Sequence, residues 1–286
     1  MDTYLLDWLH ELLRYGHIAT AMIWIGASFF FVWLDNSLVP ADGEGDRDLG
    51  VSGSLWALYG GAFYNMRKFP LGPRRGAVSH LHWLYWESYA TWLSGMALLL
   101  GPLYVAHAGW AAWGFILVGW LGYEVLCWAC RSFSGRYVAW WVALGVLLAD
   151  RLACQWFPGQ VAFLLVGTML GTIMTANIFF RVIPGQRASV AHMLAGHLPP
   201  SHGVQRGKVR SLHNTYLALP VLVTMLSHHN PMLSERSGNW VVLAVLMLMA
   251  VLVRHFFVER HKGRLRWELW MWVGGLGTAV VAWLAP

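Results

Sequence analysis

Apolar residues gather along the chain into eight long runs, separated by polar segments or by segments rich in glycine and proline. A helix needs about 20 consecutive apolar residues to cross the hydrocarbon core of a bilayer. The runs occupy residues 11–34, 84–106, 110–130, 136–154, 160–183, 211–228, 239–258 and 266–284. This pattern predicts an all-α protein, a polytopic transmembrane helical bundle of about eight spans.

The basic residues predict how this bundle is oriented. If the N-terminus lies outside, 17 of the 20 Lys and Arg residues fall in inner loops or at the inner ends of spans. Only Arg14, Arg151 and Arg236 then lie on the outer side. Because cytoplasmic loops carry an excess of Lys and Arg, we expect both termini to lie outside, in a bacterial inner membrane.

Composition excludes several classes of protein. With 57% hydrophobic and 12% charged residues, the chain is not an ordinary soluble domain. The net charge of +6 is explained by topology and by contact with anionic lipid headgroups, not by nucleic-acid binding. Cys127 and Cys130 have CxxC spacing, but no His follows them. A c-type haem attachment site is therefore excluded there, and we interpret both as small apolar residues.

We expect residues 1–286 to form a single transmembrane domain with two long cytoplasmic loops. The first, residues 35–79, contains the aromatic, glycine-rich segment SLWALYGGAFYNM, which we expect to pack back on the bundle. The second, residues 184–210, carries His192, His197 and His202. Long loops in compact proteins are often functional.

Polar residues inside the predicted spans are candidate functional residues, because ionisable groups in a membrane are energetically costly. They fall into two groups by depth. The outer group is Arg14, His17, His107, His228 and His229. The inner group is His80, His82, Glu87, Glu124, Asn177, Arg181, His213, Asn214, His255 and Glu268.

Three interpretations of these residues remain open. Paired imidazoles on facing helices can hold a b-type haem, with His17 and His228 as an outer pair and His82 and His213 as an inner pair. Histidines and carboxylates along a membrane can also relay protons or line a transport path. Histidines at helix ends can simply contact headgroups. In the inner group, the arginine fork of Arg181 and nearby amide donors would suit a planar anion.

Five segments carry a resemblance to a known family. They are LRYGHIATAMIWIGASFFFVWLDNSL, LYGGAFYNMRKF, HLHWLYWESYATWLSG, GTIMTANIFFRVIPGQ and HNTYLALPVLVTMLSHHNP. In this order they resemble the membrane domain of bacterial urate hydroxylase of the PuuD type, over nearly the whole chain. His17 and the following Trp24-Ile25-Gly26 are also similar to the first span of small membrane haem proteins such as HemJ-type protoporphyrinogen oxidases.

The resemblance to urate hydroxylase implies an activity in purine catabolism. Urate would be oxidised to 5-hydroxyisourate, with oxygen supplied by water and electrons passed to a cytochrome c. Members of the family often continue into a cytochrome c domain, whereas this sequence stops at Pro286 and contains no CxxCH. We therefore expect an external cytochrome c as the acceptor. Tyr59 stands where the family pattern has a His.

We expect a substrate pocket open to the cytoplasm and roofed by residues 56–66. In it, Arg181 would clamp the urate anion, Asn177 and Asn214 would bind its carbonyls, and Tyr59 would contact it. Glu87 or His213 would be the general base, and membrane haem b would carry electrons outward. Two alternatives remain: a transporter or channel for a purine or small anion, and a non-catalytic haem-binding subunit.

Overall fold

The computed structural model describes residues 2–70, 81–100, 102–132, 135–195, 197 and 201–285. Residues 71–80 and 198–200, which include His80 and parts of both predicted loops, lie outside this range. Each of the eight apolar runs overlaps a helix. These helices are α1 (Asp2–Ser37), α3 (Trp86–Leu99), α4 (Pro102–Ala129), α5 (Gly135–Trp156), α6 (Gly159–Asn177), α8 (Ser201–Ser227), α10 (Asn239–His261) and α11 (Glu268–Leu284). The run 84–106 extends from α3 into the start of α4.

Five segments are long and apolar enough to cross a membrane. They are Tyr4–Ser37, Gly109–Ala129, Tyr137–Trp156, Gly159–Leu194 and Asn239–His261, and the shorter helix Glu268–Leu284 is also apolar. Helix α3 has only 14 residues, about 21 Å at helical rise. The predicted run 84–106 is interrupted, because α3 ends at Leu99 and α4 is broken at Gly109 by a backbone φ of 57°. Eight complete crossings stay a prediction.

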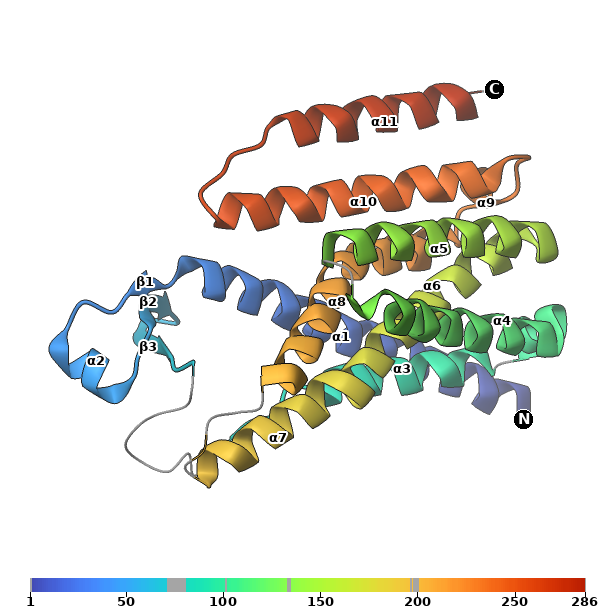
Figure 1. Cartoon of the computed structure of the whole chain (residues 1–286). Helices are drawn as coiled ribbons and strands as arrows, with labels where there is room; N and C mark the ends of the chain where they lie inside the picture. The colour runs from blue at the N-terminus through green and yellow to red at the C-terminus, as the bar shows by residue number, and fades with distance from the viewer. Residues whose placement is uncertain are drawn as a thin grey trace.

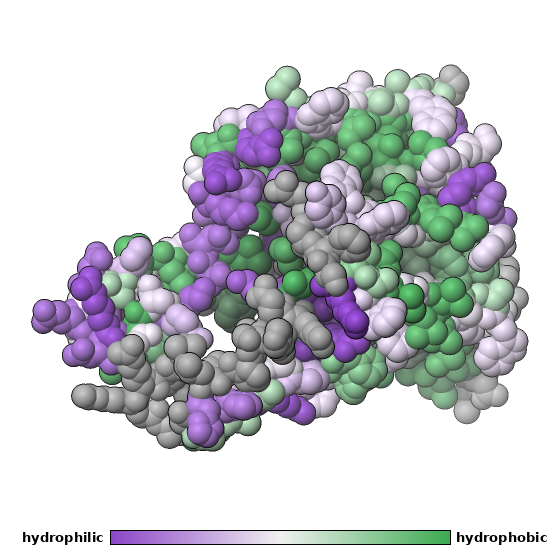
Figure 2. Space-filling view, viewed as in Figure 1, coloured by the Kyte–Doolittle hydropathy of each residue, from purple (hydrophilic) through white to green (hydrophobic). Residues whose placement is uncertain are grey.

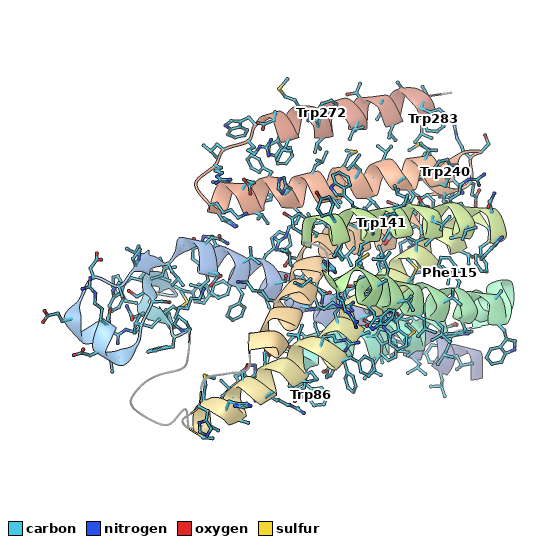
Figure 3. The ribbon with its side chains drawn as sticks, viewed as in Figure 1. Trp86, Phe115, Trp141, Trp240, Trp272 and Trp283 are labelled. Carbon is cyan, nitrogen blue, oxygen red and sulfur yellow. The ribbon has the colours of Figure 1, made fainter. Side chains whose placement is uncertain are left out.

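The two chain ends lie at the same end of the bundle (Figure 1). Following the charge-based prediction, we call this the outer end and the opposite one the inner end. Green, apolar surface covers much of the bundle, whereas hydrophilic surface gathers towards the inner end, around α2 (Glu44–Leu49) and the end of α10 (Figure 2). Trp272 and Trp283 lie towards opposite ends of α11, and Trp240 lies at the outer end of α10 (Figure 3).

Helix α6 is the centre of the bundle, and it packs against α3, α4, α5 and α8. Most of its side chains are buried, including Phe163, Val166 and Leu170. Two glycines permit close packing. A Cβ on Gly167 of α6 would lie 2.4 Å from the Oγ1 of Thr224 on α8, and one on Gly119 of α4 would lie 2.3 Å from the sulfur of Met169. Helices in membranes use such small residues to approach one another closely.

The first long loop folds into a small antiparallel sheet rather than packing back on the bundle. Its strands are β1 (Val39–Pro40), β2 (Gly53–Tyr59) and β3 (Ala62–Lys68), in the order β1-β2-β3. Tyr59 pairs with Ala62 across a two-residue turn, where Gly60 and Gly61 both have positive φ, as tight hairpins require.

The sheet projects beyond the inner end of α1 (Figure 1). Its aromatic side chains are mostly exposed, with Tyr59 at 80%. An ion pair between Lys68 and Asp35 connects β3 to the end of α1. The expectation that residues 56–66 pack on the bundle and roof a pocket therefore differs from the structure. Two short strands rich in apolar and aromatic residues, joined at Gly60 and Gly61, instead form a hairpin.

Candidate functional site: a buried polar network and an apolar cavity with two histidines

A network of polar side chains lies between α4, α6 and α8 towards the inner end. Tyr123 on α4 and His213 on α8 are joined by a 2.8 Å contact between the phenol oxygen and Nδ1. Asn177 on α6 donates from Nδ2 to the Tyr123 oxygen at 3.0 Å and to Oδ1 of Asn214 at 2.8 Å. Asn214 in turn donates to the carbonyl of Met174 at 2.9 Å. Asn177 is fully buried, and within the described part of the chain its amide bonds to Tyr123, Asn214 and Arg210.

The same network contains one carboxylate and two arginines. Glu124 accepts from Arg181 at 2.9 Å and from Arg210 at 3.0 Å. Arg210 also donates to Oδ1 of Asn177 at 3.2 Å, and its guanidinium lies 4.7 Å above the ring of Tyr123. Arg210 is buried, whereas the Arg181 side chain is 47% exposed. The network therefore runs from the bundle interior to the inner surface.

A short π-helix, η2 (Ile178–Val182), positions Arg181. The N–H of Ile183 bonds to the carbonyl of Ile178, five residues earlier. Pro184, at the start of α7 (Ile183–Leu194), has no N–H to continue an α-helical ladder. A π-turn inserts an extra residue into the helix and often marks functional sites. Here it lies directly after Asn177.

The hydrogen bond between Tyr123 and His213 can run in either direction, depending on the tautomer of His213. The phenol oxygen accepts from Asn177, and its own hydrogen can be donated to Nδ1 of His213. In that arrangement His213 carries its hydrogen on Nε2.

The structure brings together five of the residues predicted from the sequence: Glu124, Asn177, Arg181, His213 and Asn214. It places three others elsewhere. His82 is exposed in the segment before α3, Glu87 is half-buried in the first turn of α3, and Tyr59 lies at the hairpin turn. The predicted inner haem pair of His82 and His213 gains no support from this arrangement.

Sequence reasoning missed the central residue of the network, Tyr123. A tyrosine in an apolar, tryptophan-rich helix looks like an interfacial or packing residue. Its neighbour Glu124 was the available signal, because a carboxylate inside a span requires buried partners.

An apolar cavity of about 360 Å³ lies between α1, α3, α6 and α8 towards the outer end. His17 on α1 and His228 at the end of α8 both line it, together with apolar side chains such as Trp24, Trp92 and Met225. The predicted outer pair of histidines therefore faces a common cavity, in the size range of small-molecule and cofactor sites.

His17 is held by the backbone of α3. Its Nδ1 lies 2.9 Å from the carbonyl oxygen of Thr91 and 3.1 Å from Oγ of Ser94. A carbonyl can only accept, so the hydrogen of a neutral His17 is on Nδ1 and Nε2 keeps a free lone pair. Gly95 allows this approach, since a Cβ there would lie 2.9 Å from Cε1 of the ring.

His228 is the second imidazole of the cavity. It follows α8, is buried, and stacks on His229 with 3.8 Å between ring centroids. Its Nδ1 is buried and makes no hydrogen bond with the described residues. One imidazole on α1 and one directly after α8, both lining an apolar space, provide the type of donors that hold a b-type haem. Among the described residues, no three His, Cys, Asp or Glu side chains form a separate metal site.

The cavity and the polar network are adjacent. Met174 and Thr175 on α6 line the inner part of the cavity. The carbonyl of Met174 accepts from Asn214, and Thr175 lies two residues before Asn177. Helix α6 therefore lines the apolar cavity with Met174 and Thr175 and enters the polar network with Asn177.

Comparison with known proteins supports one family. The profile described as "Urate oxidase N-terminal" matches residues 3–109 and 102–285, nearly the whole chain. No curated protein and no solved structure matches significantly.

Proposed function

Because the chain belongs to the urate oxidase N-terminal family, we propose that it is a membrane-bound oxidoreductase that converts urate to 5-hydroxyisourate and passes electrons to a cytochrome c. The family and the apolar helices establish a membrane protein with a urate-related function. The acceptor, the haem and the location in a bacterial inner membrane are part of the proposal.

The proposed reaction has a simple balance. Urate and one water give 5-hydroxyisourate, two protons and two electrons. The oxygen of water forms the new C–O bond, urate is oxidised, and two cytochrome c molecules are each reduced by one electron. The protein must therefore bind a planar anion, accept protons, and conduct electrons away from the substrate.

The network supplies groups for binding and for proton transfer. Asn177 and Asn214 carry amides that match purine carbonyls and ring N–H groups, but both amides are bonded within the network, so substrate binding would require these hydrogen bonds to be exchanged for bonds to urate. Tyr123 and His213 form a hydrogen-bonded pair in which the phenol can take a proton from the substrate while passing its own to Nδ1 of His213. In this proposal the predicted base His213 acts through Tyr123. Glu87 lies in another helix, α3, and has no assigned step.

The role predicted for Arg181, that of clamping the urate anion, has to be modified. Its guanidinium pairs with Glu124, which it shares with Arg210, and is half-exposed at the inner surface. It can guide an anion towards the network, but it is not a free clamp.

The cavity supplies a place for an electron carrier. His17 and His228 would hold a b-type haem there, and such a haem would take up and release one electron at a time. Nδ1 of His17, bonded to Thr91, fixes the ring orientation and leaves Nε2 for the metal. Apolar side chains around the cavity exclude water. The observation that supports the proposal most is that two histidines of the predicted outer pair line one cavity next to the network.

A spectroscopic experiment tests this function. The full chain, purified and reconstituted in lipid nanodiscs, is examined by reduced-minus-oxidised visible spectroscopy, and urate is then added under argon with cytochrome c. We expect a b-type haem spectrum, reduction of two cytochromes for each urate lost, and no peroxide. Urate uptake into vesicles without any acceptor, combined with no urate loss, would instead support a transporter.

A further inference from the structure

One stripe of residues on α1 changes from polar to apolar as the helix runs inward from the outer end of the bundle (Figure 1). The stripe consists of His10, Arg14, His17, Ala21 and Trp24, whose spacing keeps them on one face of an α-helix. All five line the apolar cavity. At a helical rise of about 1.5 Å per residue, Arg14 lies about 4.5 Å and His10 about 10 Å outward from His17.

The wall of the cavity on α8 shows the same gradient. Ala218, Val221 and Met225 line the cavity along the helix, whereas His228 and His229 line it beyond the last helical residue, at the outer end. Among the described residues that line the cavity, there is no Asp or Glu. The cavity is therefore apolar towards the middle of the bundle, and its charged or titratable groups at the outer end are all basic.

His10, Arg14 and His229 form what we call the outer mouth of the cavity. Nη1 of Arg14 donates to Glu11 at 2.8 Å. Both side chains of this pair are close to half-exposed, at 45% and 40%, so water screens the pair and it contributes little to stability. A guanidinium has five N–H groups, so a bond from Nη1 leaves donors for a second carboxylate. The outer mouth is therefore suited to the anionic end of a ligand.

Gly171 on α6 forms part of the cavity wall. It lies in the middle of a helix, where glycine is less favourable than alanine. Close packing on α8 explains Gly167, but a Cβ added to Gly171 would meet no atom within 4 Å. Helix packing therefore does not require a glycine at this position. Its effect is to leave open space and bare backbone in the cavity, which lets a flat ligand approach the helix closely.

Two tryptophans give the cavity flat aromatic walls. Trp24 on α1 and Trp92 on α3 both line it. Nε1 of Trp92 donates to Oγ1 of Thr172 at 3.1 Å, which fixes the orientation of the ring. Flat rings interact more favourably with another aromatic system than area burial alone explains. The walls therefore favour a flat aromatic body over a flexible acyl chain.

We propose that the outer mouth binds the carboxylates of a flat amphipathic ligand whose apolar body fills the cavity beside Gly171. The expected ligand is the haem of the proposed function, with its propionates at the outer mouth, and this identity alone rests on that function. Arg14 is the main positioning residue, because its charge is permanent. The propionate edge would then face the outer side, from which electrons leave to an external cytochrome c.

The outer mouth is tested with metal-free protoporphyrin IX and with its dimethyl ester, in which both propionates are uncharged. Binding to the full chain in phosphatidylcholine nanodiscs is followed by porphyrin fluorescence, and empty nanodiscs give the lipid background. At low salt we expect Arg14→Gln to weaken binding of the acid about fivefold, an effect limited by exposure and reduced by added salt, and to leave the ester unaffected. Arg14→Lys keeps the charge but not the fork, so its affinity is intermediate. Arg236→Gln, at an exposed arginine that does not line the cavity, is the matched control and leaves binding unchanged.

A variant at Gly171 shows where the porphyrin binds. Gly171→Leu places a side chain in the open space of the cavity, so binding of both the acid and the ester falls to the lipid background. Gly171→Ala adds a single methyl group and weakens binding of both while the melting temperature stays near that of the wild type. Arg14→Gln also keeps its melting temperature, because it removes only an exposed ion pair.

Three outcomes overturn the outer mouth as a carboxylate site. They are equal binding of the acid and the ester, binding of the acid that is unchanged in Arg14→Gln, and binding that survives Gly171→Leu. Haem that is retained through its histidine ligands despite any of these results leaves the proposed function standing without the outer mouth.

A final arm identifies the ligand with labelled palmitate, which carries a carboxylate on an acyl chain. Binding of protoporphyrin that palmitate does not displace supports the flat macrocycle. Palmitate binding that depends on Arg14, without any binding of protoporphyrin, keeps the carboxylate site but contradicts haem as its ligand. Binding of neither compound overturns the proposal.

Discussion

Nδ1 of His17 on α1 lies 2.9 Å from the carbonyl oxygen of Thr91 on α3. Thr91 lies inside α3, and its carbonyl also accepts from Oγ of Ser94 at 3.1 Å, so the imidazole of His17 adds a further hydrogen bond from another helix. Because this bond places the hydrogen on Nδ1, it leaves Nε2 available at the cavity that His228 also lines. A hydrogen bond between two helices thus determines which nitrogen of His17 is free to bind a metal.

Substituting either cavity histidine should remove the proposed haem. We expect His17→Ala and His228→Ala to show loss of the b-type absorbance in the reduced-minus-oxidised spectrum, because each removes one axial ligand. His192→Ala, an exposed histidine on α7, is the control and should keep the full haem content. Haem content equal to the wild type in both cavity variants would contradict the assignment.

Gly95→Ala should disturb the same site without touching a polar group. The added methyl would lie 2.9 Å from Cε1 of His17, so the ring must shift or α1 and α3 must separate. We expect a shifted or weakened haem spectrum. Gly122→Ala on α4, where an added Cβ meets nothing within 4 Å, should leave the spectrum unchanged. Identical spectra for the two variants would show that the close approach of Gly95 is unimportant.

Glu124→Gln should destabilise the protein far more than Arg181→Gln. Loss of the carboxylate leaves the buried Arg210 unpaired, which we expect to cost about 3–5 kcal/mol. The Arg181 pair is half-exposed, so its loss should cost less than about 1 kcal/mol. Thermal unfolding in detergent compares the two. Equal shifts in melting temperature would mean that Arg210 is satisfied in some other way.

Tyr123→Phe should impair urate oxidation while keeping the haem. The substitution removes the hydroxyl that joins Asn177 to His213, and with it the proposed proton transfer. We expect the rate of cytochrome c reduction to fall by about 10²-fold or more, the usual contribution of general acid–base catalysis. Haem content serves as the internal control for folding. Full activity in this variant would place proton transfer elsewhere.

Tyr59→His should have little effect. Tyr59 is 80% exposed at the tip of the hairpin, and surface substitutions usually change stability by about 0.5 kcal/mol or less. We expect unchanged melting temperature and unchanged urate turnover, measured by loss of urate absorbance. A large gain in turnover would support the alternative that this chain is catalytically silent because a needed histidine is missing.

Apolar run length predicted the helices well, because the requirement to satisfy backbone hydrogen bonds in lipid leaves few other structures. All eight runs contain a helix. Less could be predicted for residues 53–68, where an aromatic, glycine-rich composition was compatible with either packing on the bundle or a hairpin. The paired strands and positive-φ glycines resolve this in favour of the hairpin.

The types of residue in the candidate site could be predicted from the sequence, but which side chains contact one another could not. Asn177, His213 and Asn214 were identified because polar residues in a membrane span are costly. Neither the role of Tyr123 nor the pairing of Arg181 with Glu124 could be predicted from the sequence, because both depend on which helices are neighbours.

By itself, the sequence determined the class of protein, the helical runs and the family, since each depends on local composition or on residue order. Tertiary structure alone decided which charges are compensated. It paired Arg181 and Arg210 with Glu124, left Arg254 buried against Phe29, and placed His17 and His228 around one cavity. The physical reason is that electrostatic and hydrogen-bond partners are set by distances between helices, which the order of residues along one chain does not encode locally.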